Sequence, residues 1–134
     1  MDGESAATGP GGGTLRRLLW LDIAFELAAG AALLAAFRPI AGWLDIREAL
    51  VLAGGLVFIA AGALIWLLSK DPVAAGRVRA LAFANVVGAL AGWFVLMAGW
   101  THFQGEGRWV LGFAADSMLL IGVAELLVLR RRDG

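Results

Sequence analysis

Four long apolar stretches fill most of this 134-residue chain, and only short loops separate them. They cover residues 18–37, 49–69, 78–100 and 109–129. Each is about 20 residues long, enough for a helix that rises about 1.5 Å per residue to cross a hydrocarbon core of about 30 Å. Because the stretches are continuously apolar rather than alternating, helices are favoured over the strands of a barrel. The sequence therefore predicts four membrane-spanning helices.

Composition excludes a soluble domain of this size. Hydrophobic residues make up 60% of the chain, more than a small globular core hides from water. Short loops also force consecutive helices to lie antiparallel and side by side. We therefore expect a glycine-rich, disordered cytoplasmic tail over residues 1–14, followed by one all-α domain over residues 15–132. That domain is predicted to be an up-down-up-down four-helix bundle that spans the membrane.

Positively charged residues predict the orientation of this bundle. Eight lie at the helix ends on the side of the two termini: Arg16, Arg17, Lys70, Arg77, Arg79, Arg130, Arg131 and Arg132. The opposite side carries Arg38, Arg47 and Arg108. Since cytoplasmic loops are enriched in Lys and Arg, both termini are expected in the cytoplasm, and the protein in a bacterial-type inner membrane. The basic side also suits anionic lipid headgroups.

Local patterns predict where two of the helices begin. Asp45 and Glu48 have the spacing of a capping box, which predicts that the second helix begins there, after an outer loop over residues 38–48. Asp71 and Pro72 form a good N-cap and first-turn pair for the third helix.

Small residues recur at every fourth position of two helices. They are Ala24, Ala28, Ala32 and Ala36 in the first helix, and Ala84, Gly88 and Gly92 in the third. Such stripes let helix backbones approach closely in a membrane. We expect this packing within the monomer, with a homodimer seam as the alternative.

Ionisable and amide side chains interrupt the apolar stretches. Asp22 and Glu26 are four residues apart, so they lie on one face of the first helix. Asn85 on the third helix and Glu125 on the fourth lie at similar depths, in the cytoplasmic half of the membrane. Where the three helices turn these faces inward, the four side chains form a single polar cluster open to cytoplasmic water. They are the candidate proton or cation site, because intramembrane ionisable residues are functional candidates by default.

The alternative is a structural role for the same residues. Asp22 would pair with Arg16 or Arg17, Glu125 would pair with the arginines that follow it, and Asn85 would hydrogen-bond between helices. Against this, two acids in the first helix oppose its insertion in isolation. The helix therefore needs partner helices, water access, or protonation of at least one acid.

Other polar residues predict no further site. Asp116 lies nine residues before Glu125 and half a turn around the helix, so we expect it to reach outward toward Arg108, with a subunit interface as the alternative. His102 is the only histidine and the chain has no cysteine, so no metal or haem site is expected. The sequence contains neither a grouping of Ser, His and an acid nor a glycine-rich phosphate loop. We therefore expect that the protein is not an enzyme and binds no cofactor.

Two family resemblances bear on function. Residues 79–100 with Asn85, followed by Ala124, Glu125 and a run of three arginines, resemble small uncharacterised bacterial inner-membrane proteins of four helices. That resemblance implies a fold and no activity. Glu26, a carboxylate in the first of four short helices, is similar to the glutamate of the small multidrug resistance exporters, which exchanges protons for cationic drugs. This chain departs from those exporters by adding Asp22, Asn85 and Glu125.

From the sequence we expect a small integral inner-membrane protein with a non-catalytic, accessory or structural role. The alternative is a proton-coupled carrier of small cations or drugs that acts as a dimer. In that case Glu26 would be the proton and cation site, Asp22 and Glu125 the access path, and Asn85 the residue that orients the site. The expected partners are the lipid bilayer and either a second copy or another membrane protein, with no nucleic acid.

Overall fold

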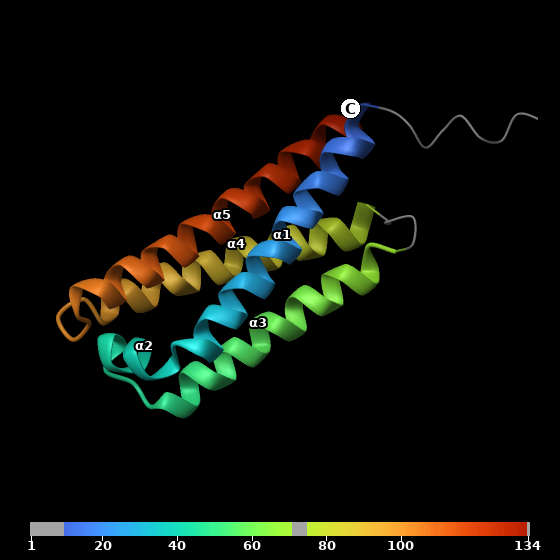
Figure 1. Cartoon of the computed structure of the whole chain (residues 1–134). Helices are drawn as coiled ribbons and strands as arrows, with labels where there is room; N and C mark the ends of the chain where they lie inside the picture. Colours follow the sequence, from blue (N-terminus) through green and yellow to red (C-terminus); the bar gives the residue numbers. More distant parts are fainter. Residues whose placement is uncertain (1–9, 71–74, 134) are drawn as a thin grey trace, which may run out of the picture.

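The structure, a computed structural model, describes residues 10–70 and 75–133 of the chain. Its helices are α1 (Pro10–Ala35), α2 (Phe37–Leu44), α3 (Glu48–Leu68), α4 (Ala75–Ala98) and α5 (Gly105–Asp133). All except α2 are long and apolar enough to cross a membrane, and they pack as a bundle (Figure 1). The predicted all-α bundle of four spanning helices is confirmed. The chain is an integral, multi-pass membrane protein.

The bundle consists of two antiparallel hairpins rather than a closed ring of neighbours. α1 packs against α3, α4 packs against α5, and the two hairpins meet along α1 and α5 (Figure 1). Within the described residues, no Cα atom of α3 lies within 8 Å of one in α4. The expectation that every consecutive pair of spanning helices lies side by side is therefore wrong for α3 and α4.

The first helix begins earlier than the sequence suggested. α1 starts at Pro10, a residue well suited to a first helical turn because its fixed φ matches the helix and its missing N–H would be unpaired there anyway. The predicted tail is therefore wrong for residues 10–14, and residues 1–9 lie outside the described part of the chain. So does the predicted start of the third helix at Asp71 and Pro72, since α4 is described from Ala75.

The short helix α2 replaces most of the predicted outer loop. Asp45 ends α2 in the left-handed conformation, with φ of 50°. Arg47 is the N-cap of α3, and no side chain forms a capping hydrogen bond there. The predicted capping box at Asp45 and Glu48 is therefore wrong, because Asp45 serves the end of α2 instead of the start of α3.

α2 closes the bundle at the end opposite the termini. Its residues Ile40, Ala41 and Leu44 are buried together with Val51 of α3, a group we call the α2 cluster. The loop between α4 and α5 is tied to this helix by Gln104. The backbone N–H of Gln104 donates to the Trp43 carbonyl at 2.8 Å, and its side-chain amide donates to the Gly42 carbonyl at 3.2 Å.

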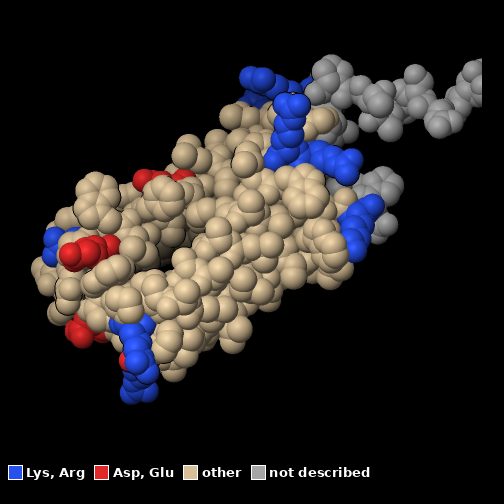
Figure 2. Space-filling view, viewed as in Figure 1, with Lys and Arg blue, Asp and Glu red and all other residues tan. Residues whose placement is uncertain are grey.

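A second apolar group closes the other end, where α1 begins and α5 ends (Figure 1). This terminal cluster takes residues from all four spanning helices: Leu15, Leu19, Ile23, Ile65, Val78 and Leu129. Lys and Arg side chains gather most densely on the surface at this end, and a broad belt made almost entirely of uncharged side chains separates them from the opposite end (Figure 2). The belt suits contact with lipid hydrocarbon, which solvates no charge.

Small residues bring the helices close at one expected stripe, at Gly88 and Gly92 although not at the exposed Ala84, and also at a glycine pair that belongs to neither stripe. Gly30 of α1 faces Gly55 of α3, and Gly88 and Gly92 of α4 face Met118 and Ala115 of α5. The remaining stripe behaves differently: Ala24, Ala28 and Ala32 are all exposed on α1. The expectation that this alanine stripe packs within the monomer is therefore wrong for these three residues.

Candidate functional site

Four polar side chains that the sequence singled out meet inside the bundle. Asp22 and Glu26 of α1, Asn85 of α4 and Glu125 of α5 are all buried. The side-chain amide of Asn85 donates a hydrogen bond of 3.0 Å to Oδ2 of Asp22. The two residues are 63 positions apart, so this bond links the first hairpin to the second. We call the four residues the polar cluster.

The polar cluster brings together acidic groups, and some of their carboxyl oxygens have no hydrogen-bond partner among the described residues. Asp22 is close enough to Glu26 and to Glu125 to interact with each electrostatically. Within the described part of the chain, Oδ1 of Asp22 and both carboxyl oxygens of Glu125 are buried without a hydrogen-bond partner. Buried polar groups in proteins are usually hydrogen-bonded, so this deficit marks the cluster as unusual.

Close helix packing at Gly122 builds one side of the cluster. A Cβ atom on Gly122 would lie 2.7 Å from the Ala82 carbonyl oxygen and 3.1 Å from Cβ of Asn85. Only a residue without a side chain lets α4 approach α5 this closely. Glu125 follows on the same helix, one turn nearer the terminal cluster, so the close approach sets Asn85 and Glu125 on facing surfaces.

The cluster is enclosed rather than open to water. Asp22 is 1% exposed and Glu125 is 0% exposed. The terminal cluster lies between these residues and the end of the bundle at the termini, and the α2 cluster closes the other end. The expectation of a cluster open to cytoplasmic water is therefore wrong.

Among the arginine side chains that the structure describes, none forms the predicted pairs with Asp22 or Glu125. Arg16 and Arg17 are exposed, whereas the Asp22 carboxylate faces the interior and accepts its hydrogen bond from Asn85. Glu125 likewise has no hydrogen bond to Arg130 or Arg131. All three acids are buried between the helices instead of reaching the surface.

The chemistry available to this arrangement is the binding of protons or of a positively charged, hydrogen-bonding ligand. Carboxylate oxygens accept hydrogen bonds and neutralise cations, and the Asn85 amide adds one donor already directed at Asp22. Among the described residues, no three His, Asp or Glu side chains are arranged to share a metal ion.

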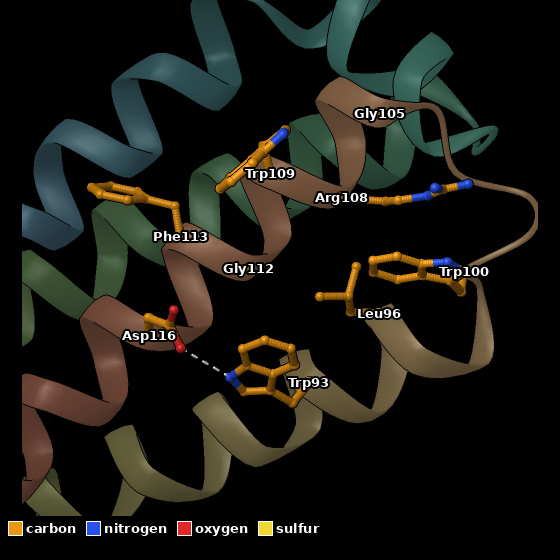
Figure 3. A pocket seen from close by; sticks show the side chains of 9 residues that line it. All are labelled: Trp93, Leu96, Trp100, Gly105, Arg108, Trp109, Gly112, Phe113 and Asp116. Carbon is orange, nitrogen blue, oxygen red and sulfur yellow. Dashed lines mark hydrogen bonds between the residues drawn. The ribbon is translucent and has the colours of Figure 1, made fainter.

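Asp116 takes a partner that the sequence did not suggest. Its Oδ1 accepts a hydrogen bond of 3.2 Å from the indole N–H of Trp93 (Figure 3). Arg108, the partner expected for it, lies over the ring of Trp100 instead, with 4.6 Å between the guanidinium carbon and the ring centre. One signal was present in the sequence: Trp93 and Asp116 lie at matching depths on consecutive antiparallel helices.

Comparison with known proteins assigns no role to these residues. No protein-family model, no curated protein and no solved structure matches this chain.

Proposed function

We propose that this protein is a proton-coupled carrier of a small cation, and that the polar cluster is its binding site. The observation that carries the proposal is the enclosure of three carboxyl groups inside the bundle, with unpaired oxygen atoms on Asp22 and Glu125. An uncompensated carboxylate away from water is costly, and the cost falls when a proton or a cation neutralises it. The cluster is thus suited to hold one or the other.

The repulsion between closely spaced carboxylates gives a reason for the cluster to exchange a proton for a cation. Asp22 interacts with both Glu26 and Glu125, so the three groups cannot all be ionised without repulsion. A monovalent cation that enters would displace one proton, and the net charge of the cluster would stay constant. In this scheme Glu26 holds the exchanged proton or cation, and Asn85 fixes the position of Asp22.

In the carrier scheme, this structure corresponds to a state in which the two apolar clusters close the site at both ends of the bundle. The terminal cluster and the α2 cluster separate the acids from the two ends of the bundle. Among the spanning helices, the close backbone contacts between the hairpins are those of α1 with α5. A tilt of one hairpin against the other would open a path to the site once the Asn85–Asp22 hydrogen bond breaks and the terminal cluster separates. Relative motion of two such units is how many carriers expose a central site to alternate sides.

One observation favours the accessory or structural role instead. The hydrogen bond between Asn85 and Asp22 joins the two hairpins, and interhelical hydrogen bonds of this kind stabilise membrane bundles. A structural role accounts for these two residues. It leaves Glu125 unexplained, because neither of its oxygens bonds to anything within the described residues.

Proton release tests the carrier proposal. We expect purified protein in weakly buffered detergent solution to release about one proton for each monovalent cation bound, since an occupied carboxylate must be deprotonated. The added ions would be Na⁺, K⁺, methylammonium and tetramethylammonium, with pH recorded by an indicator dye. Glu26→Gln should abolish the release, while Glu48→Gln, at an exposed position, should leave it unchanged.

Two results would contradict the proposal. One is native protein that releases no protons with any of these ions. The other is release that persists in Glu26→Gln. Circular dichroism of each variant shows whether the helices remain folded.

We further infer that both termini lie in the cytoplasm of a bacterial-type inner membrane. The gathering of Lys and Arg at the end where α1 begins and α5 ends supports this orientation (Figure 2). Because the chain has no cysteine, single cysteines report it cleanly. In intact cells a membrane-impermeant maleimide should label Ile46→Cys, and should label Gly13→Cys only after permeabilisation. The opposite pattern would reverse the assigned orientation.

A further inference from the structure

A groove runs between α4 and α5 on the outside of the bundle, away from the polar cluster. It holds an open-sided pocket of about 490 Å³, within the size range of small-molecule sites. Four aromatic residues line it, with one charged residue toward each end (Figure 3). The aromatic residues are Trp93, Trp100, Trp109 and Phe113, and the charged ones are Arg108 and Asp116.

Asp116 is the unusual member of this groove. It lies 11 residues after the start of α5 at Gly105, about 16 Å along a spanning helix at 1.5 Å per residue. Its carboxylate is exposed and accepts a hydrogen bond from the neutral indole of Trp93. An indole N–H satisfies one oxygen and leaves the negative charge uncompensated. Carboxylates in the membrane are rare and generally pair with a positive charge.

Arg108 does not supply that charge. It is eight residues from Asp116, about 12 Å along the helix. Figure 3 shows its guanidinium beside the ring of Trp100, at the loop end of the groove and directed away from Asp116. The two opposite charges therefore stand at different ends of the groove, with aromatic surface between them.

We propose that this groove binds a lipophilic organic cation, with Asp116 as counter-ion and the rings of Trp93, Trp109 and Phe113 as aromatic walls. Ring faces attract cations, and most strongly those that carry little water, such as quaternary ammonium and phosphonium groups. Trp109 is 82% exposed and Phe113 is 71% exposed on the face that the bilayer covers. The ligand therefore enters from the lipid, which requires an apolar body around its charge.

This site is independent of the carrier proposal. Asp116 precedes Glu125 by nine residues, which places the two carboxylates on opposite faces of α5. Glu125 is fully buried in the polar cluster, and Asp116 faces outward. Substitutions at one site leave the residues of the other in place, so either proposal can fail without the other.

Two probes of the same shape and opposite charge test the groove. Binding of tetraphenylphosphonium and of tetraphenylborate to the purified protein would be measured by equilibrium dialysis at constant detergent concentration. We expect the phosphonium to bind and the borate not to bind. Asp116→Asn keeps an oxygen for the Trp93 hydrogen bond but removes the charge, and should weaken phosphonium binding about tenfold or more.

Three further variants complete the experiment. Glu26→Gln should leave phosphonium binding unchanged, which separates the groove from the polar cluster. Arg108→Gln should leave it unchanged or strengthen it, because a like charge is removed. Trp109→Ala, at a strongly exposed position that the fold does not require, should weaken it and provides a second test if Asp116→Asn fails to fold.

Three results would contradict the proposed groove site. Equal phosphonium binding by the native protein, Asp116→Asn and Trp109→Ala would mean partition into the micelle and would overturn the site. Borate binding that is lost in Arg108→Gln would mean that the groove takes anionic amphiphiles instead. Loss of phosphonium binding in Glu26→Gln alone would place the cation in the polar cluster and remove it from the groove.

Discussion

Glu125→Leu should make the folded protein more stable, by about 1–3 kcal/mol, the usual cost of leaving a buried polar group without a hydrogen bond. Glu125 is completely buried, and neither of its carboxyl oxygens has a hydrogen-bond partner within the described residues. Leucine fills a similar volume without a polar atom. The midpoint of thermal unfolding in detergent, followed by tryptophan fluorescence, measures the change.

The matched control for this variant is Asp22→Leu. Asp22 accepts the hydrogen bond of Asn85, so its loss leaves a buried amide unpartnered and should destabilise the protein by about 1–3 kcal/mol. Opposite signs at these two positions would separate an acid kept for function from an acid that also supports the bundle. Residues retained for activity at a cost in stability are common in functional sites. Destabilisation by Glu125→Leu would contradict the functional assignment of Glu125.

Gly30→Val should destabilise the bundle by about 1–3 kcal/mol, the typical cost of overpacking a well-packed interface. A Cβ atom at Gly30 would lie 2.9 Å from the carbonyl oxygen of Gly55 and 2.8 Å from Cγ1 of Ile59. The Ile59 side chain can rotate, but the Gly55 carbonyl belongs to the backbone of α3. The two helices therefore have to move apart, and the packing between them is lost.

Gly54→Val is the matched control for Gly30→Val. A Cβ atom at Gly54 would have Leu33 Cδ1 as its nearest neighbour, at 3.9 Å, which is an ordinary contact. We expect little change in the thermal unfolding midpoint for this variant. An equal loss of stability in both variants would show that valine disturbs the helix itself, and that the close approach of α1 and α3 is not the cause.

The number and type of spanning helices was predictable, whereas the short helix between the first two was not. Runs of about 20 apolar residues admit essentially one structure in a bilayer, because every backbone polar group must be paired internally. α2 has only eight residues, and Pro39 and Gly42 within it favour a loop. Its burial of Ile40, Ala41 and Leu44 depends on contacts with α1, α3 and α5, which local sequence does not encode.

The membership of the polar cluster was also predictable, but its environment was not. Residue spacing gives the depth of each acid along its helix, which is why Asp22, Glu26 and Glu125 were grouped with Asn85. The rotation of each helix about its own axis depends on side-chain packing, as at Gly122 against Ala82. For the same reason the sequence left open which neighbour Asp116 would contact.

The link between Asp22 and Asn85 also bears on how the chain is made. α1 is synthesised before α3, and α3 before α4 and α5. α3 already covers part of Glu26, because a Cβ atom on Gly62 would lie 3.2 Å from Cβ of Glu26. Asp22 is different, since its hydrogen-bond partner Asn85 belongs to α4. The first hairpin therefore carries the Asp22 carboxyl group without this partner until the second hairpin docks against it.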